Sequence, residues 1–95
     1  MPRVHERTTF FAETVLESSS GRQPARISDI SAGGCYIDTI VEVNVGDAVA
    51  FEIARADSKS MRFNGTVAYH FAGMGFGVQY SKLTDLQSQF LKQFT

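Results

Sequence analysis

Residues 61–80 read MRFNGTVAYHFAGMGFGVQY, and this stretch decides the fold. Apolar side chains alternate with polar or small ones on both sides of a turn signal, Ala72-Gly73. A period of two is the signature of a β-strand, because successive side chains point to opposite faces of a sheet. The stretch therefore predicts two strands joined by a turn. The expected apolar faces consist of Met61, Phe63, Val67 and Tyr69 on the first strand and Met74, Phe76, Val78 and Tyr80 on the second.

The segments on the N-terminal side also read as strands. Residues 49–54 alternate in the same way, and residues 10–17 and 22–30 flank a serine-rich turn at 18–21. Residues 35–38 predict one short strand. Six or so short antiparallel strands suggest a closed barrel, because closure removes exposed sheet edges.

The C-terminal end changes its period from two to that of a helix. Thr84 followed by Gln87 is the pattern of a capping box, which starts a helix. We expect a short α-helix over 83–94 that packs its apolar stripe on one mouth of the barrel. The stripe consists of Leu83, Leu86, Phe90 and Phe94. The predicted fold class is all-β, a six-stranded antiparallel barrel with a short C-terminal α-helix.

Composition narrows the function classes. The chain has 95 residues, which fits a single domain over 1–95. Nine Lys and Arg balance ten Asp and Glu, so we expect no DNA or RNA partner that needs a strongly basic surface. No apolar run approaches the ~20 residues of a membrane span, and the N-terminus lacks the apolar stretch of a signal peptide. We therefore expect no membrane insertion and a cytoplasmic location.

The residue types needed for catalysis or metal binding are scarce. The two histidines, His5 and His70, lie far apart in the sequence, and Cys35 is the single cysteine. Ser31 does not sit in a G-x-S-x-G elbow. The glycines at 73–77 lack the spacing of a phosphate-binding loop and are better explained by close packing over a strand. We expect no enzymatic activity, no metal and no cofactor.

Two motifs carry the polar groups that could bind a ligand. Arg3 and Arg7 form R-x-x-x-R, and a guanidinium can chelate a guanine edge or pair with a phosphate. Asp29, Ser31 and Gly34 form D-x-S-x-x-G after a strand. A carboxylate and a hydroxyl there could read a guanine, and glycine would let it approach. Each motif also has a structural explanation, as a solvated terminus or as a turn.

Taken together, the two motifs resemble the PilZ domain family. They occur in the right order, about a strand hairpin apart, and the resemblance covers nearly the whole chain, including the closing strand and helix. It implies a PilZ-type barrel over 9–80 and a flexible N-terminal arm over 1–8. Such domains bind cyclic di-GMP, and the arm folds over the ligand. Signal would then pass to an unidentified protein partner.

The resemblance also implies roles for particular residues. Arg3 and Arg7 would grip guanine edges and phosphates, Asp29 and Ser31 would read a guanine, and Gly34 would leave room for it. His70 or Phe71 could supply a base-stacking ring.

Two other readings remain open. One is a PilZ-like domain that binds only protein partners. The other is a small barrel for single-stranded nucleic acid, which would need a basic groove with exposed aromatic residues.

Overall fold

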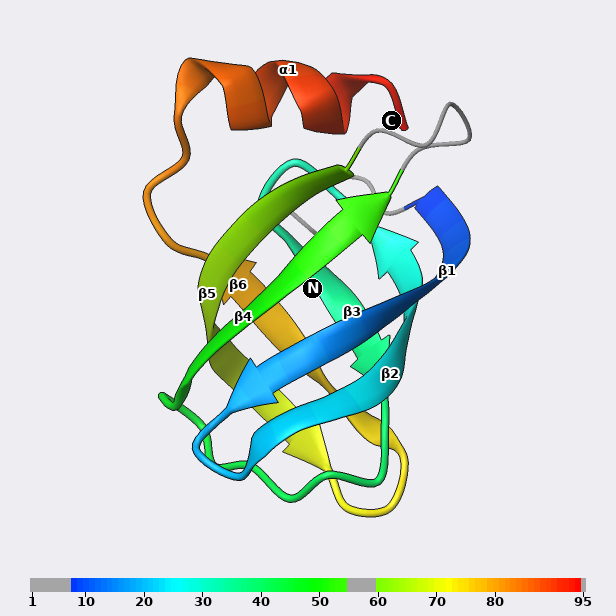
Figure 1. Ribbon diagram of the computed structural model, residues 1–95, viewed down its shortest axis with the longest axis vertical. Helices are drawn as coiled ribbons and strands as arrows, with labels where there is room; N and C mark the ends of the chain where they lie inside the picture. The colour runs from blue at the N-terminus through cyan, green and yellow to red at the C-terminus, as the bar shows by residue number, and fades with distance from the viewer. Residues whose placement is uncertain (1–7, 55–59, 95) are drawn as a thin grey trace, which may run out of the picture.

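The computed structural model describes residues 8–54 and 60–94, and these form a closed barrel of six antiparallel strands with one helix (Figure 1). The order around the barrel is β1-β2-β3-β6-β5-β4. The predicted all-β barrel is therefore confirmed. Its elements are β1 (Thr8–Ser18), β2 (Gly21–Ile30), β3 (Gly34–Asp38), β4 (Ala48–Ala54), β5 (Ser60–Phe71), β6 (Gly75–Tyr80) and α1 (Asp85–Lys92).

The inward side chains of the alternating strands fill the barrel. Phe51, Phe63 and Phe76 are fully buried, and the rings of Phe51 and Phe63 stack with centroids 6.3 Å apart. Burying an aromatic side chain of this size contributes about 1.5–3 kcal/mol to folding. The alternation read from the sequence thus becomes the core.

A bulge in β5 changes which face one aromatic residue occupies. Val67 pairs with Val78, but the next pair is Tyr69 with Gly77, so Ala68 is the extra residue. An extra residue reverses the alternation beyond it. The prediction that Tyr69 shares a face with Phe63 and Val67 is therefore wrong. The ring of Tyr69 instead covers Gly77, where an added Cβ would lie 2.3 Å from the ring, which explains this small residue in β6.

Both mouths of the barrel are covered (Figure 1). At one end lies α1, whose Phe90 ring is 6.0 Å from that of Phe63, and whose first turn carries the expected capping box of Thr84 and Gln87. At the other end the loop 39–47 passes below the strands and buries Val43. No described helix is long and apolar enough to cross a membrane.

Candidate ligand-binding site

The first strand begins beside the end of the second. Thr8 pairs with Ile30, and Thr9 pairs with Asp29. The described residues begin at Thr8, so the two arginines of R-x-x-x-R, Arg3 and Arg7, lie outside them. The chain that carries both arginines is therefore attached at the corner where β2 ends. Five residues of extended chain reach at most about 18 Å.

Ser31 holds the connection between β2 and β3 together. Its hydroxyl accepts hydrogen bonds from the backbone N–H groups of Gly33 (3.3 Å) and Gly34 (3.1 Å) and donates to the Gly34 carbonyl (3.1 Å). The Ser31 N–H donates to the same carbonyl at 2.9 Å. Ser31 is buried, so its hydroxyl already serves the turn.

Gly34 owes its identity to a neighbouring strand. It is not among the glycines with a positive φ, which are Gly21, Gly46, Gly73 and Gly75. A Cβ at Gly34 would lie 2.0 Å from the carbonyl oxygen of Val78 in β6. Backbone conformation therefore does not explain the glycine at this position of the turn. Close approach of β3 to β6 requires it instead.

Asp29 lies on the outer face of β2, half-buried, beside an aromatic strip. Its cross-strand partner is Tyr36 in β3, which pairs in turn with Gly77, and Gly77 pairs with Tyr69. The rings of Tyr36 and Tyr69 have centroids 6.1 Å apart. Burial raises the pKa of Tyr36, as do the nearby groups Asp38, Tyr69 and Asp29. The site thus joins a carboxylate to two aromatic rings.

Sequence reasoning did not identify Tyr36 as part of this strip. Its position beside Asp29 depends on the register of β2 against β3, where a bulge lies between Ile27 and Asp29. No spacing in the sequence reports that register. Only the alternation of β3 could have shown that Tyr36 faces outward, because its neighbours Cys35 and Ile37 are buried.

A cation also borders the site. Arg26 donates to the Oδ2 atom of Asp38 from Nη2 (2.9 Å) and Nε (3.2 Å). Its guanidinium lies over the ring of Phe11, 5.2 Å from the centroid. These contacts hold Arg26 on the outer face of β2, on the same strand as Asp29. Its charge is already paired, so a ligand anion would have to compete with Asp38.

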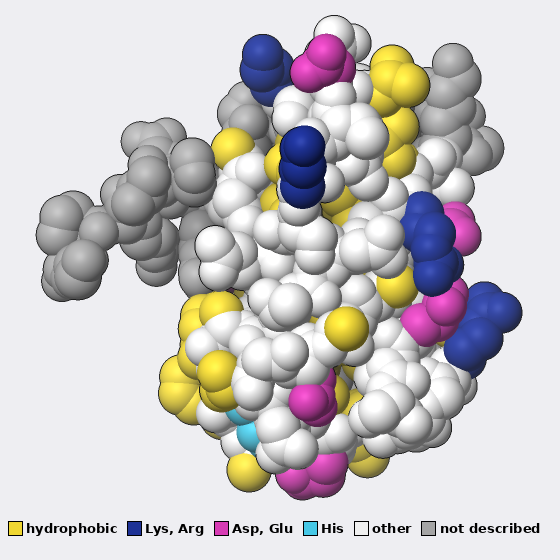
Figure 2. All heavy atoms as spheres, turned by 90° about the vertical axis from the view of Figure 1, so that its left-hand side faces the viewer, with side chains coloured by type: hydrophobic (Ala, Val, Ile, Leu, Met, Phe, Trp, Pro, Cys, Tyr) yellow, Lys and Arg dark blue, Asp and Glu magenta, His cyan; other side chains and the backbone are white. Residues whose placement is uncertain are grey.

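The two rings proposed for base stacking lie further along β5. Phe71 pairs with Gly75 and is 54% exposed, and its ring is 5.6 Å from that of Tyr69. His70 pairs with Phe76 and is half-buried. Figure 2 shows hydrophobic side chains gathered at the lower end of the molecule, the end at which the β5–β6 turn lies in Figure 1. Exposed Met74 belongs to this turn.

The described residues contain groups that could bind an organic ligand but no cluster that could bind a metal. No cluster of three or more His, Cys, Asp or Glu side chains that could hold a metal occurs in residues 8–54 and 60–94. Asp29 lies at the end of β2, and Ser31 and Gly34 are hydrogen-bonded to each other in the connection to β3. What the corner can do chemically is accept hydrogen bonds and stack against a planar group.

The closed six-stranded barrel capped by one helix places the protein in the class of small all-β barrel domains. A family model of the PilZ domain matches residues 2–95, so the chain belongs to the PilZ domain family. PilZ domains are receptor and effector domains for cyclic di-GMP, not enzymes, which agrees with the expected absence of catalysis. A comparison with curated protein sequences gives no match.

Solved structures share the fold at low sequence identity. The inhibitor of motility MotI/DgrA from Bacillus subtilis has a TM-score of 0.82 and 16% identity over 99% of this chain and 49% of its own. PlzA from Borreliella burgdorferi in complex with c-di-GMP has a TM-score of 0.75 and 12% identity, over 98% of this chain and 40% of its own. The PilZ domain of CeSA from a cellulose synthesizing bacterium has a TM-score of 0.66 and 15% identity, over 90% of this chain and 88% of its own. The chain thus spans half or less of the first two proteins.

Proposed function

We propose that this domain is a receptor for cyclic di-GMP that acts in the cytoplasm and passes the signal to a protein partner. The observation that carries the proposal is the pairing of Thr8 with Ile30 and of Thr9 with Asp29. Because Arg7 precedes Thr8 in the sequence, this pairing supports a location of R-x-x-x-R within reach of D-x-S-x-x-G. In the sequence alone, the two motifs are related only by their order along the chain. The solved complex of PlzA with c-di-GMP, which shares the fold, supports the choice of ligand.

In this proposal the ligand lies on the outer face near the β2–β3 corner. The Asp29 carboxylate accepts from the N1–H and N2–H₂ groups of a guanine, and the ring of Tyr36 beside it offers a surface for stacking. Arg3 and Arg7 close over the ligand and bind guanine edges or phosphates. Gly33 and Gly34, held by Ser31, form a corner without bulky side chains that a base can approach.

The energetics favour moderate affinity. Ordering an arm of about eight residues costs roughly 1–2 kcal/mol per residue. Each bidentate arginine–guanine contact returns about 1–3 kcal/mol, and each hydrogen bond to a charged group about 1.5–3 kcal/mol. The cost of ordering the arm is therefore of the same order as the free energy that its own contacts return, which argues against very tight binding. We expect a Kd in the micromolar range, which corresponds to about −8 kcal/mol at 1 μM.

Isothermal titration calorimetry with cyclic di-GMP tests the arginine assignment. We expect Arg7→Ala to weaken binding by about tenfold or more, because a charge-assisted contact is lost. Arg7→Lys should weaken it too, because lysine lacks the planar fork of donors. The matched control is Arg22→Ala, since Arg22 lies at the opposite end of β2 from Asp29. Unchanged affinity in Arg7→Ala, or no heat with the wild-type protein, contradicts the proposal.

Trypsin digestion tests the proposed closing of the arm. Trypsin cuts after arginine, so cleavage at Arg3 and Arg7 should slow in the presence of cyclic di-GMP if the arm closes over it. Cleavage at Lys82, an exposed residue between β6 and α1, provides the internal control. Equal slowing at all three positions would indicate general stabilisation by ligand, and no slowing would contradict arm closure.

One observation keeps a second candidate function in view. The hydroxyl of Ser31 is used in the turn, and Gly34 is required by Val78, so both motif residues have structural roles without a ligand. A PilZ domain that binds only a protein partner would keep them for the fold alone. The calorimetric titration separates the two functions, because that domain gives no heat with cyclic di-GMP.

A further inference from the structure

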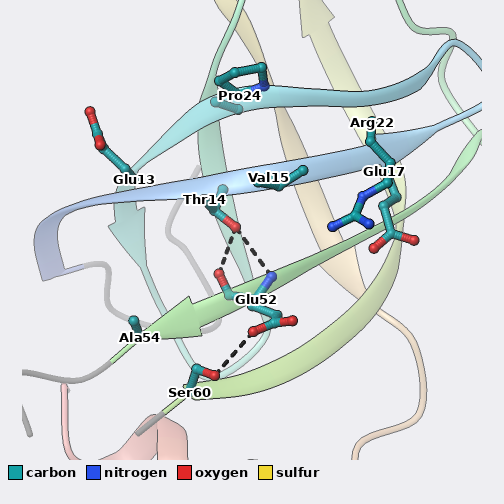
Figure 3. A pocket seen from close by; sticks show the side chains of 10 residues that line it. Glu13, Thr14, Val15, Glu17, Arg22, Pro24, Glu52, Ala54 and Ser60 are labelled. Atoms are coloured by element: carbon teal, nitrogen blue, oxygen red, sulfur yellow. Dashed lines mark hydrogen bonds between the residues drawn. The ribbon is translucent and has the colours of Figure 1, made fainter. Parts of the chain in front are cut away.

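The barrel closes loosely between its first and fourth strands. The ladder joins β1 and β4 at one residue pair, Glu17 with Ala50. Three residues before Glu17 in β1, a side chain replaces the backbone hydrogen bonds between the two strands. The Thr14 hydroxyl donates to the carbonyl of Glu52 (2.7 Å) and accepts from its N–H (3.2 Å). Figure 3 shows the two strands spreading apart on the far side of Thr14.

A groove of about 450 Å³ lies over this seam, and its lining shares no residue with the β2–β3 corner. It takes residues from four strands, with β1 contributing from Glu13 to Glu17 and β4 contributing Glu52 and Ala54. The β1 part alone measures roughly 13 Å along the strand. The groove therefore extends along β1 and also spans the open junction between β1 and β4.

The charges in the groove are unevenly distributed. Among residues 8–54 and 60–94, its lining holds three carboxylates and one guanidinium, an excess of two negative charges. Near the Glu17 end the charges balance, because Arg62 donates to both carboxylate oxygens of Glu17 at 2.6 and 2.9 Å, and the charge of Arg22 also lowers the pKa of Glu17. Glu13 lies near the wide end. Glu52 lies at the level of Thr14, where it pairs across the ladder with Arg62 and its carboxylate accepts a hydrogen bond from the Ser60 hydroxyl (3.0 Å). Neither forms an ion pair within residues 8–54 and 60–94.

Between the carboxylates the groove is apolar. Val15 is 43% exposed, and its cross-strand partner Pro24 is also exposed. Ala25 and Ala54 complete this part of the lining. Lysine and arginine side chains combine an apolar stem with a charged head, so they suit an apolar floor with carboxylates at its rim.

We propose that this seam groove is a docking site for an extended, basic segment of a partner protein. The partner's main chain lies along β1 and β4, a lysine or arginine stem packs on Val15 and Pro24, and its charged head pairs with Glu13 or Glu52. Charge complementarity selects a cationic occupant. The separation of β1 and β4 beyond Thr14 leaves two strand edges along which an extended chain, rather than a helix, can lie. The site does not depend on cyclic di-GMP binding and has its own test.

The test uses a fluorescein-labelled peptide of about eight alternating lysine and threonine residues, which spans roughly 26 Å when extended. Fluorescence polarisation measures its binding to the full chain, and amide shifts in two-dimensional NMR locate it. We expect shifts along β1 and β4 and weaker binding at higher salt. In Glu13→Gln/Glu52→Gln, the affinity should fall between about fivefold and thirtyfold. The matched control is Glu42→Gln, an exposed carboxylate on the 39–47 loop.

Four outcomes would overturn the proposal. One is equal binding of a glutamate–threonine peptide, and another is the same loss of affinity in Glu42→Gln. Shifts confined to other strands would place the peptide elsewhere. Equally tight binding of spermine, a small polycation, would show a cation site without selection for an extended chain. Because Glu13 and Glu52 are exposed, we expect the variant with glutamine at both positions to keep the fold. An unchanged urea midpoint of unfolding verifies this.

Discussion

At the scale of single residues, the corner between β2 and β3 combines structural and binding groups. Ser31 and Gly34 stabilise the turn and the approach of β3 to β6, while Asp29 presents its half-buried carboxylate on the outer face. A variant at this corner can therefore lose ligand binding either because the turn is destabilised or because a group that contacts the ligand is removed. Stability and affinity must be measured together to separate them.

Replacing Ser31 by Ala should destabilise the domain by about 1–3 kcal/mol. The change removes a hydroxyl that accepts from Gly33 and Gly34, leaving these half-buried N–H groups without that partner. Urea denaturation followed by circular dichroism measures the effect. Ser19→Ala, at an exposed turn position, should change stability by no more than about 0.5 kcal/mol. Equal stability of the Ser31 and Ser19 variants would contradict the structural role of Ser31.

Replacing Gly34 by Ala should destabilise the domain by at least about 1–3 kcal/mol, the usual cost of overpacking. The new methyl group would meet the main-chain carbonyl of Val78, which cannot rotate away as a side chain could. Hydrogen exchange of the amides in β3 and β6 should quicken first. Ala32→Ser, at an exposed neighbouring position, is the control. A stable Gly34→Ala variant that only loses cyclic di-GMP would assign the glycine to ligand access instead.

At the scale of elements, β1 is the strand on which both proposed binding sites meet. Its first residue adjoins the β2–β3 corner, and its residues 13–17 line the seam groove. The strand is held firmly to β2 along nine residue pairs and to β4 at one. Thr14 supplies part of the missing connection to β4 through its side chain.

Replacing Thr14 by Val should therefore weaken the closure of the barrel, by about 1–2 kcal/mol. Valine keeps the shape of threonine but cannot pair with the carbonyl and N–H of Glu52. Urea denaturation gives the loss of stability. Thr66→Val, on the exposed face of β5, should leave stability within about 0.5 kcal/mol. If both variants unfold at the same urea concentration, the hydroxyl of Thr14 does not hold the seam.

At the scale of the whole molecule, closure of the barrel depends on contacts between elements far apart in the sequence. Arg62 in β5 reaches across β4 to Glu17 in β1, a separation of 45 residues. The side-chain hydrogen bonds from Arg62 hold the pKa of Glu17 below its usual value of 4.5. Since the folded pKa is lower than the unfolded one, this pair stabilises the fold above about pH 4.5.

The stabilisation should be lost as the pH falls through the lowered pKa of Glu17. Below it the carboxyl is protonated in both states and the pair with Arg62 is gone. We expect the urea midpoint to drop more between pH 7 and about pH 3 in the wild-type protein than in Glu17→Gln, which has no such charge to lose. Glu42→Gln should behave as the wild type. Equal drops in all three proteins would show that this pair contributes nothing to closure.

Much of the fold followed from local pattern. Alternation in residues 49–54 and 61–67 predicted which side chains fill the barrel, and the capping box at Thr84 predicted where α1 begins. The prediction failed at Tyr69, because the bulge at Ala68 is a property of the pairing between β5 and β6. It also failed at Met74 and Leu86, which were expected on apolar faces and are 68% and 69% exposed. The site was predicted in part: the β2–β3 corner was identified, and Tyr36 was missed.

The sequence by itself determined the barrel, its capping helix and the polar corner, since periodicity and turn chemistry act over a few neighbouring residues. Only the tertiary structure decided that Tyr36 lies beside Asp29, that Tyr69 faces outward, and that β1 and β4 separate beyond Thr14. Each of these depends on strand register and bulges. Register is fixed by contacts between distant segments, and local periodicity carries no information about which residues will face one another.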